Sequence, residues 1–552
     1  MGNGTHSGPA ETPRLDQRAF TELWPYAAFA CFVVLYNSLL LRQGYIPSDD
    51  GYLQSVAQRI LDGQRPYLDF YFLRTPLSVY LQAAFMALFG HSYTILTARL
   101  LCTAEVTGIA LIVSRLYSHL SSSWEFCLLM ISSYIVTTLL INFPWYSYDG
   151  LFFAVLSLYL LERRLPIWSG AAACLAALCK QNYALLVPLL AAIALLSRGV
   201  CPGEAAIKGR SIARMATGFT LVLGAYLMYI LAIGAVHSFW NNVVSLPASL
   251  AGQTIGGFLF QDNRQALLRS AVSLLPVAAL FFLSSLRWFQ TAAAAAALAW
   301  IGFRLYGNVY SFVYFILWLN YLILAVVIGI TWWRRRRGRN IGRDPSASLL
   351  AMAVGIQYIS GFNYSGVLFA QMGAGVAFPF AYLAARSLVS SPWIRRVVPL
   401  AFLIAISALG VHHRYGTVYV YHEHPRSELT TPFASEKLRG ITSTAANVAG
   451  LDALIAVIKS NTAATDSIFV FPQYPALYFL TGRRNPTAID WYYYLEFNQS
   501  MLDESLSTLE RTRPKLIFVN SENLPVRLSK LLSSSYELIP ANTPGKIYLR
   551  RT

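Results

Sequence analysis

Long apolar runs separated by short polar segments make up most of the chain. A run of about 20 apolar residues is long enough to cross the hydrocarbon core of a bilayer as a helix. The pattern therefore predicts a polytopic α-helical membrane protein with about 13 transmembrane helices. The expected helices lie near 24–41, 95–118, 125–142, 148–162, 166–180, 183–197, 216–236, 267–286, 290–306, 310–332, 347–362, 366–386 and 396–411.

The composition supports this prediction. Hydrophobic residues make up 56% of the sequence and charged residues only 12%, whereas soluble domains carry about 25% charged residues. The net charge of +17 could suggest a nucleic-acid partner. However, the basic residues fall between the apolar runs and form no basic domain, so we expect contact with membrane lipids and not with nucleic acid.

The basic residues also predict an orientation, because cytoplasmic loops carry an excess of lysine and arginine. Residues 1–23 are expected to form a cytoplasmic tail without a cleavable signal peptide. The loops 42–94 and 237–265, the turn 143–147 and the C-terminal region then lie outside an inner (plasma) membrane. The connections placed inside carry Arg163 and Arg164, the basic residues of 198–214, Arg287, Arg334 to Arg337, Arg386, Arg395 and Arg396.

From His412 onward the pattern of the sequence changes. Residues 444–460 and 499–513 have the spacing of amphipathic helices, and the stretches SIFVF, KLIFV and KIYLR are typical of short strands. Alternating helices and strands predict a small α/β domain. We therefore expect a transmembrane domain over 24–411 and an exported α/β domain, periplasmic or extracellular, over 412–552.

A cluster of charges follows the first apolar run. The stretch PSDDGYLQSVAQRILDGQRPYLDFYFLRTPLSVYL, residues 47–81, holds four aspartates and three arginines. Its apolar spacing predicts two helices on the membrane surface, near 52–62 and 76–89. Asp49 and Asp50 precede the first helix and Arg74 precedes the second. The two aspartates could simply cap the first helix, since acidic residues favour helix N-termini.

Other ionisable residues are expected on the same side of the membrane. Asp149 lies at the outer start of the fourth apolar segment, Lys180 at the outer end of the fifth, and Arg304 near the outer end of the ninth. Ionisable groups at membrane depth are costly and are often functional. Carboxylates and cations gathered at one face suggest a site for an anionic, lipid-attached substrate. Lys180 and Arg304 could also be residues that reach for the interface.

The order of SDDGY, LDGQRPYLDF and RTPLSVYLQA resembles the first outer loop of the GT-C glycosyltransferases that use polyprenyl-phosphate sugars. The nearest branches are the protein mannosyltransferase-like family and the lipid A aminoarabinose transferase. The resemblance covers roughly the first 200 residues, and more loosely the helix layout and the C-terminal domain. This chain has Asp-Asp where many members have Asp-Glu, and Arg-Thr-Pro-Leu instead of Lys-Pro-Pro-Leu, so the sugar and acceptor stay open.

The resemblance implies roles for individual residues. Asp49 matches the catalytic carboxylate of the first loop, with Asp50 beside it as a substrate-binding residue, and Asp149 matches a second acidic position. Arg74 matches a basic position expected to bind the donor phosphate. Lys180 and Arg304 are further candidates for substrate binding, as are Asn363 and Tyr364 in the stretch GFNYSG, although this stretch could be a plain turn.

The implied enzyme is an inverting hexosyl- or pentosyltransferase of the cell envelope. A carboxylate accepts the proton of an acceptor hydroxyl on a glycan, lipid or protein, and a guanidinium stabilises the phosphate that leaves. A divalent metal could share that second role, but no cluster of His and Asp residues identifies one. The alternative function is a lipid or anion transporter or flippase, although no internal repeat of the kind common in transporters is visible.

Overall fold

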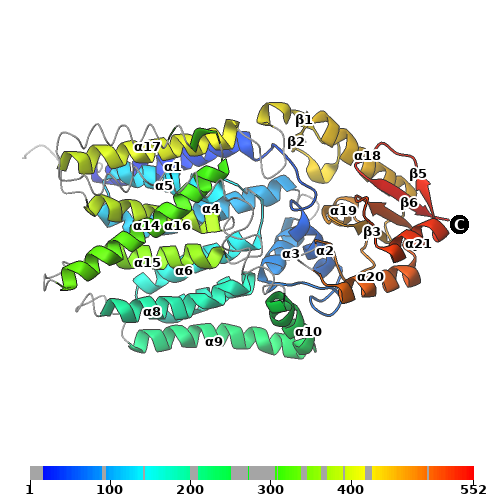
Figure 1. Cartoon of the computed structure of the whole chain (residues 1–552), viewed down its shortest axis with the longest axis horizontal. Coiled ribbons are helices and arrows are strands. Elements are labelled where there is room, and N and C mark those ends of the chain that lie inside the picture. Colours follow the sequence, from blue (N-terminus) through cyan, green and yellow to red (C-terminus); the bar gives the residue numbers. More distant parts are fainter. Residues whose placement is uncertain are drawn as a thin grey trace, which may run out of the picture.

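The computed structural model describes residues 17–89, 95–140, 143–198, 209–249, 305–307, 309–336, 345–361, 370–388, 392–416, 425–493 and 497–551, with Val272 and Gly302. Apolar helices form a bundle over most of this length, and a smaller α/β unit stands at one end of it (Figure 1).

The bundle helices overlap the apolar segments expected from the sequence. The predicted segments 267–286 and 290–306 lie almost wholly outside the described residues, so the number of about 13 helices stays a prediction. The bundle helices are α1 (Gln17–Leu40), α4 (Ile95–Tyr117), α5 (Ser123–Thr138), α6 (Tyr146–Glu162), α7 (Pro166–Cys179), α8 (Leu186–Arg198), α9 (Gly209–Ala232), α14 (Val309–Arg336), α15 (Pro345–Ser360), α16 (Ala370–Leu388) and α17 (Pro392–Gly416).

Local sequence explains several helix boundaries. Ser122 and Glu125 form a capping box at the start of α5, which satisfies backbone N–H groups that have no partner within the helix. Pro166 occupies the first turn of α7, where its fixed φ suits a helix and its missing N–H is not needed. Short helices connect or extend the bundle helices: η2 (Ser118–Leu120) joins α4 to α5, η3 (Gln181–Leu185) joins α7 to α8, and α10 (Val236–Trp240) and the π-helix η4 (Asn241–Ser245) follow α9.

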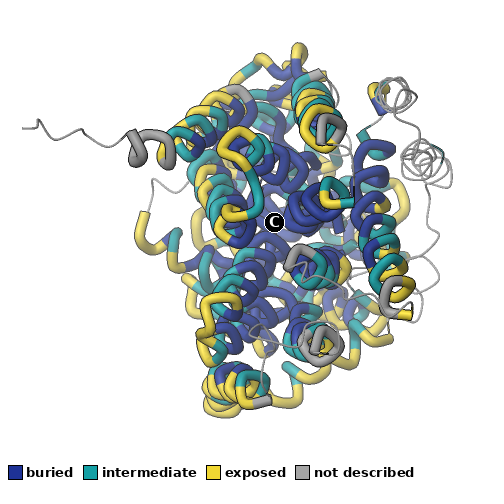
Figure 2. The backbone as a smooth tube through the Cα atoms, turned by 90° about the vertical axis from the view of Figure 1, so that its left-hand side faces the viewer, coloured by how far each residue is buried: buried dark blue, intermediate teal, exposed yellow. Residues whose placement is uncertain are grey.

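The bundle has the surface of a membrane protein. Four helical stretches among the described residues are long and apolar enough to cross a membrane: Ile95–Leu120, Arg210–Ala232, Val309–Trp333 and Arg395–Tyr415. Buried residues fill the middle of the bundle and exposed ones lie at its edge (Figure 2). Leu35, Leu221, Met228 and Ile328 are among the exposed large apolar side chains. Such outward-facing apolar side chains suit lipid tails better than water.

The α/β unit extends over residues 425–551. Its sheet has the order β3-β4-β6-β5, with β3 parallel to β4 and the other pairs antiparallel. Every residue of β3 and β4 is buried, as expected of strands covered on both faces. The elements are η6 (Arg426–Glu428), β1 (Thr431–Pro432), η7 (Glu436–Leu438), β2 (Thr442–Ser443), α18 (Ala445–Asn461), β3 (Ile468–Phe471), α19 (Ala476–Thr481), α20 (Gln499–Thr512), β4 (Leu516–Val519), α21 (Val526–Ser535), β5 (Tyr536–Ile539) and β6 (Lys546–Arg550).

Two helices of the first loop, α2 (Tyr52–Leu61) and α3 (Leu77–Phe89), lie between the bundle and the α/β unit (Figure 1). Their positions agree with the sequence prediction, but the surroundings of α2 differ from it. Gln54, Ser55 and Arg59 on the polar face of α2 are buried. The α/β unit covers this face, because the Ser55 hydroxyl donates to the Pro475 carbonyl at 2.8 Å. The helix is therefore enclosed on both faces.

The basic residues that follow α6 lie away from this loop. α6 begins beside α2, because the ring of Trp145 is 6.3 Å from that of Tyr52. Its 17 residues carry the chain about 25 Å before Arg163 and Arg164, both exposed, connect it to α7. The α/β unit and these arginines are thus at opposite ends of the bundle, an arrangement compatible with the predicted orientation.

Candidate active site

Asp50 is held by an arginine from the bundle. The Arg99 guanidinium of α4 forms an ion pair with the Asp50 carboxylate, and both side chains are buried. Arg99 also donates to the carbonyls of Leu41 at 2.8 Å and Gly44 at 2.7 Å. Burial raises the pKa of Asp50, and the positive charge of Arg99 opposes that rise. These contacts favour a positioning role for Asp50, which fixes the loop onto α4, over the substrate-binding role predicted for it.

Asp49 lies in the turn that leads into α2 and is partly exposed. Its N–H donates to the Ile46 carbonyl at 3.2 Å, and its carbonyl accepts from the Tyr52 N–H at 3.1 Å. Gly51 is the N-cap residue, in a left-handed conformation. Neither aspartate therefore occupies the N-cap position of α2.

Asp149 lies in the first turn of α6 and is buried. Its carboxyl group interacts with the Ser78 side chain of α3 and with the Glu105 carboxyl group of α4. Three helices thus meet at this carboxylate. The start of α6 carries Trp145, which touches Tyr52 at the start of α2. The structure therefore brings the two predicted acidic positions to the same end of the bundle.

Two buried cations flank one tyrosine close to Asp149. The Arg74 guanidinium lies 4.2 Å from the centre of the Tyr146 ring, and Lys180 Nζ lies 6.0 Å from it. Arg74 and Lys180 are 5% and 3% exposed, so water screens their repulsion poorly. Lys180 Nζ donates to the Ser360 carbonyl at 2.8 Å. The two predicted basic residues thus form one positively charged site, one turn before Asp149.

Backbone contacts hold this cationic site in place. The Thr75 hydroxyl donates to the Ala177 carbonyl of α7 at 2.7 Å, and the Gln181 amide donates to the Leu73 carbonyl at 3.0 Å. The Tyr67 hydroxyl donates to the Arg74 carbonyl at 2.7 Å. The segment before α3 is therefore fixed to the end of α7, where Lys180 is the C-cap residue.

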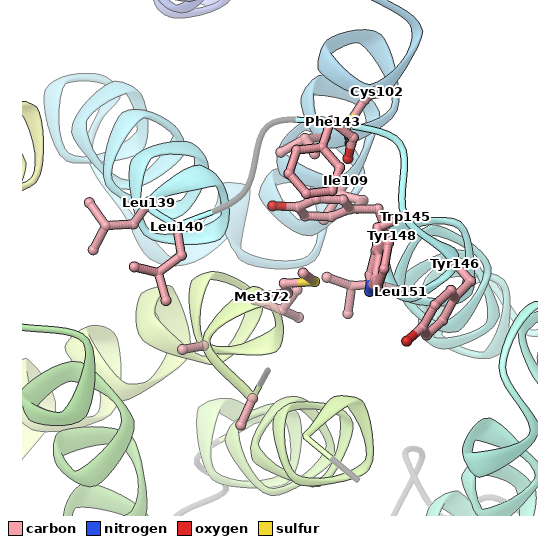
Figure 3. Close-up of a cluster of buried hydrophobic side chains, with 14 of the residues drawn as sticks. Cys102, Ile109, Leu139, Leu140, Phe143, Trp145, Tyr146, Tyr148, Leu151 and Met372 are labelled. Atoms are coloured by element: carbon pink, nitrogen blue, oxygen red, sulfur yellow. Dashed lines mark hydrogen bonds between the residues drawn. The ribbon is translucent and has the colours of Figure 1, made fainter. Parts of the chain in front are cut away.

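Aromatic side chains at the start of α6 form part of the core beside the site. Figure 3 shows Phe143, Trp145 and Tyr148 near Cys102 and Ile109 of α4, and the Tyr146 ring centre lies 4.7 Å from that of Trp145. The ring centres of Phe143 and Trp145 are 5.9 Å apart. One side of this helix start thus packs against α4, while Tyr146 is left to face the cations.

Three predicted site residues, Arg304, Asn363 and Tyr364, lie outside the described residues. The described segment before Asn363 and Tyr364 ends at Gly361. The residue before it, Ser360, accepts a hydrogen bond from Lys180 through its carbonyl. Their roles remain predictions. The histidine-rich stretch 412–424 is described only in part, and there His413 Nε2 contacts the Leu305 carbonyl at 2.7 Å. Among the described residues, no group of three or more His, Cys, Asp or Glu side chains could hold a metal ion.

Arg99 and Glu105 were not predicted as site residues. They are six positions apart in α4, so they do not share one helical face, and the sequence indicates only packing partners elsewhere in the fold. The structure supplies those partners, because Arg99 pairs with Asp50 and the Glu105 carboxyl group interacts with that of Asp149.

Comparison with protein-family models and with curated protein sequences gives no match. The chain is similar to solved structures of ArnT from Cupriavidus metallidurans. The form bound to undecaprenyl phosphate has 12% identity over 95% of this chain and 98% of that one, with a TM-score of 0.43. The apo form has 12% identity over 96% and 98%, with a TM-score of 0.45.

A third similar structure is the Archaeoglobus fulgidus oligosaccharyltransferase tethered to an acceptor peptide. Its identity is 11%, over 97% of this chain and 74% of that one, with a TM-score of 0.46. Because these TM-scores are below 0.5, the likeness assigns neither a residue nor a substrate to this chain.

Proposed function

We propose that this protein is an inverting glycosyltransferase. It moves a sugar from a polyprenyl-phosphate donor to the hydroxyl group of a glycan, lipid or protein acceptor at the outer face of the membrane. The observation that carries the proposal is the pair of buried cations, Arg74 and Lys180, which lie 4.2 Å and 6.0 Å from the centre of the Tyr146 ring, one turn from Asp149.

The cation pair suits a lipid-linked phosphate. Arg74 and Lys180 are both buried, and buried cations favour a nearby anion. A phosphate oxygen there would accept charge-assisted hydrogen bonds from both side chains. As the bond between the sugar and the phosphate breaks, the phosphate gains negative charge. The same two cations stabilise that charge in the transition state.

Asp49 is the proposed base. In the transfer, the acceptor oxygen bonds to the anomeric carbon from one face while the bond to the phosphate oxygen breaks on the other. The hydroxyl proton passes to the Asp49 carboxylate. Partial exposure of Asp49 leaves it open to an incoming acceptor, whereas Asp50 is enclosed by its contact with Arg99. Asp149 orients the acceptor or the sugar from the opposite helix.

The protein would work at the inner (plasma) membrane, with the loop 42–94 and the α/β unit on the outer side. The charge distribution supports this placement, because exposed arginines lie at the end of the bundle away from Asp49 and Asp149. A lipid-linked sugar would then reach the cations from the outer leaflet, and an acceptor would approach Asp49 from outside.

A transfer assay tests the proposal. The purified protein in lipid nanodiscs is incubated with a panel of radiolabelled polyprenyl-phosphate sugars and a cell-envelope extract as the source of acceptors. We expect one label to move to an acceptor. We expect Arg74→Ala and Lys180→Ala to weaken donor binding about tenfold or more, the scale of a lost charge-assisted hydrogen bond. Arg74→Lys should restore binding only in part, because lysine lacks the planar fork.

Lys530→Ala is the matched control, because Lys530 is an exposed lysine of the α/β unit. It should bind and transfer like the wild type. Unchanged donor binding in both Arg74→Ala and Lys180→Ala would show that the two cations do not bind the donor phosphate. Movement of the intact lipid between leaflets, with no sugar transferred, would favour the transporter alternative.

A further inference from the structure

A segment of the α/β unit is fixed firmly against the first loop. The Arg59 guanidinium of α2 lies 3.0 Å from the Asp490 carboxylate, with the side chains 9% and 3% exposed. Arg59 also donates to the Thr487 carbonyl at 3.0 Å, and the Tyr71 N–H donates to the Ala488 carbonyl at 2.8 Å. These contacts determine where the next residue, Trp491, is placed.

Trp491 faces an aromatic residue at the entrance to α2. The centres of the Trp491 and Tyr52 rings are 5.2 Å apart, and Tyr52 is 6.3 Å from Trp145. Tyr493 stacks on Trp491, with centres 5.2 Å apart and planes 18° from parallel. A row of rings therefore runs from the start of α6, across the start of α2, to the α/β unit.

This row adjoins both proposed carboxylates. Tyr52 follows Asp49 by three positions, and its N–H donates to the Asp49 carbonyl at 3.1 Å. Trp145 precedes Asp149 by one helical turn, and its carbonyl accepts from the Asp149 N–H at 3.5 Å. The rings of Tyr52 and Trp145 are thus attached to the two backbone segments that carry the proposed chemistry.

Several polar atoms beside these rings are buried without a hydrogen-bond partner among the described residues. They are the indole N–H groups of Trp145 and Trp491 and the side-chain amide nitrogen of Gln54. A buried donor without a partner costs about 1–3 kcal/mol, and such groups in a folded protein point to a missing partner. Three unused donors beside an aromatic row match a ligand that has apolar faces and many hydroxyl oxygens. A sugar ring is such a ligand.

We infer that Trp491, backed by the buried rings of Tyr52 and Trp145, forms a platform that binds a sugar ring in the transfer reaction, so that the α/β unit supplies one wall of the active site. The inference rests on the proposed function and adds a binding subsite to it. Trp491 is only partly buried, so the apolar face of the sugar packs on this ring and a hydroxyl oxygen accepts from its indole N–H. The sugar belongs either to the donor or to a glycan acceptor.

Binding measurements on Trp491→Ala test the inference and distinguish the two sources. The probes are a polyprenyl-phosphate sugar, the same polyprenyl phosphate without sugar, and a glycan acceptor. If the platform holds the donor sugar, the dissociation constant of the sugar-bearing lipid rises about tenfold and that of the bare lipid phosphate does not change. If it holds the acceptor sugar, the KM for the glycan acceptor rises by a similar factor instead.

Trp491→Phe and Trp168→Ala complete the set. The Trp491→Phe variant keeps a ring and loses the indole N–H, so we expect its sugar binding to be weaker than that of the wild type and stronger than that of Trp491→Ala. Trp168 is an exposed tryptophan at the start of α7, and its replacement should change neither measurement. The inference would be overturned if Trp491→Ala unfolds at the wild-type temperature and keeps two wild-type values. These are the dissociation constant of the sugar-bearing lipid and the KM for the glycan acceptor. Sugar binding that depends on Trp491, in a protein that transfers no sugar, would sink the proposed function alone.

Discussion

Two neighbouring aspartates, Asp49 and Asp50, meet different surroundings and so suit different tasks. Asp50 is enclosed and paired with Arg99, while Asp49 is partly exposed in the turn before α2. A paired, enclosed carboxylate cannot easily accept a proton from an incoming hydroxyl, because it would first have to give up its cation. A partly exposed carboxylate is easier for the acceptor to reach. The difference in burial, and not in residue type, favours Asp49 as the proposed base.

Asp49→Asn should therefore abolish catalysis while leaving the fold and donor binding intact. Asparagine keeps the shape and most of the polar contacts but cannot take the proton, so we expect turnover to fall about 100-fold or more. Asp69→Asn is the matched control, because Asp69 is exposed in the same loop and should retain activity. Near-normal transfer by Asp49→Asn would reject this residue as the base.

Asp50→Asn should act on stability instead. It leaves the buried Arg99 without its counter-charge. Removing one member of a buried ion pair lowers the free energy of unfolding by about 3–5 kcal/mol. Thermal unfolding in detergent measures this loss. A variant with wild-type thermal stability and no activity would show that Asp50 takes part in the chemistry directly.

At the scale of the element, the turn into α2 depends on a glycine. Gly51 has φ of +98°, a conformation that L side chains rarely adopt. A Cβ there would lie 3.1 Å from the Ala476 Cβ and 3.2 Å from the Tyr45 hydroxyl. The turn thus needs glycine both for its backbone conformation and for the close approach of α19.

Gly51→Ala tests the second requirement when it is compared with Gly63→Ala. Gly63 has φ of +84°, and a Cβ there would meet nothing within 4 Å. Both variants bear the backbone strain, about 1–3 kcal/mol, but only Gly51→Ala also presses on the α/β unit. We expect Gly51→Ala to unfold at the lower temperature and to lose more activity. Equal effects of the two substitutions would show that contact with α19 is unimportant.

The same loop marks how far sequence could predict the structure. The apolar spacing of 52–62 predicted a helix, and α2 is that helix. Periodicity identifies an apolar face but not what covers the polar one, so the burial of Gln54 and Arg59 by the α/β unit was not predictable. The pair of Arg99 and Asp50 was missed for a related reason, because 49 residues separate its members. Asp49, Asp149, Arg74 and Lys180 were predicted as site residues because charge is rare beside apolar helices; the structure places them at one end of the bundle, and their roles stay predictions.

At the scale of the whole molecule, the bundle and the α/β unit meet at the first loop. Ser55, Arg59 and Tyr71 each bond to the α/β unit. Leu73 of the loop also shares a hydrophobic cluster with Phe469 of β3. Because the loop contacts both parts, we expect it to hold Asp49 in place only while the α/β unit stays docked.

Asp490→Ala should therefore loosen this docking. It leaves Arg59 buried without its carboxylate, a change that costs about 3–5 kcal/mol for buried pairs. We expect a lower unfolding temperature and faster proteolysis within 425–493. Glu510→Ala is the matched control, because it removes one carboxylate from an exposed pair with Arg527, and such pairs contribute little. Equal protease resistance in the two variants would contradict a docking role for the buried pair.

The orientation of the molecule decides on which side of the membrane the proposed site works. If the arginine-bearing helix ends face the cytoplasm, the α/β unit and both carboxylates face outward. Single cysteines at Ser460, exposed at the end of α18, and at Arg163, exposed after α6, test this in a variant without the six native cysteines. In intact cells a membrane-impermeant maleimide should modify Ser460→Cys at once. It should reach Arg163→Cys only after the membrane is opened, because the bilayer bars it from the cytoplasmic side. Modification of Arg163→Cys alone in intact cells would show that the orientation is the reverse of the predicted one. The proposed site would then face the cytoplasm, and its lipid-linked donor would have to lie in the inner leaflet.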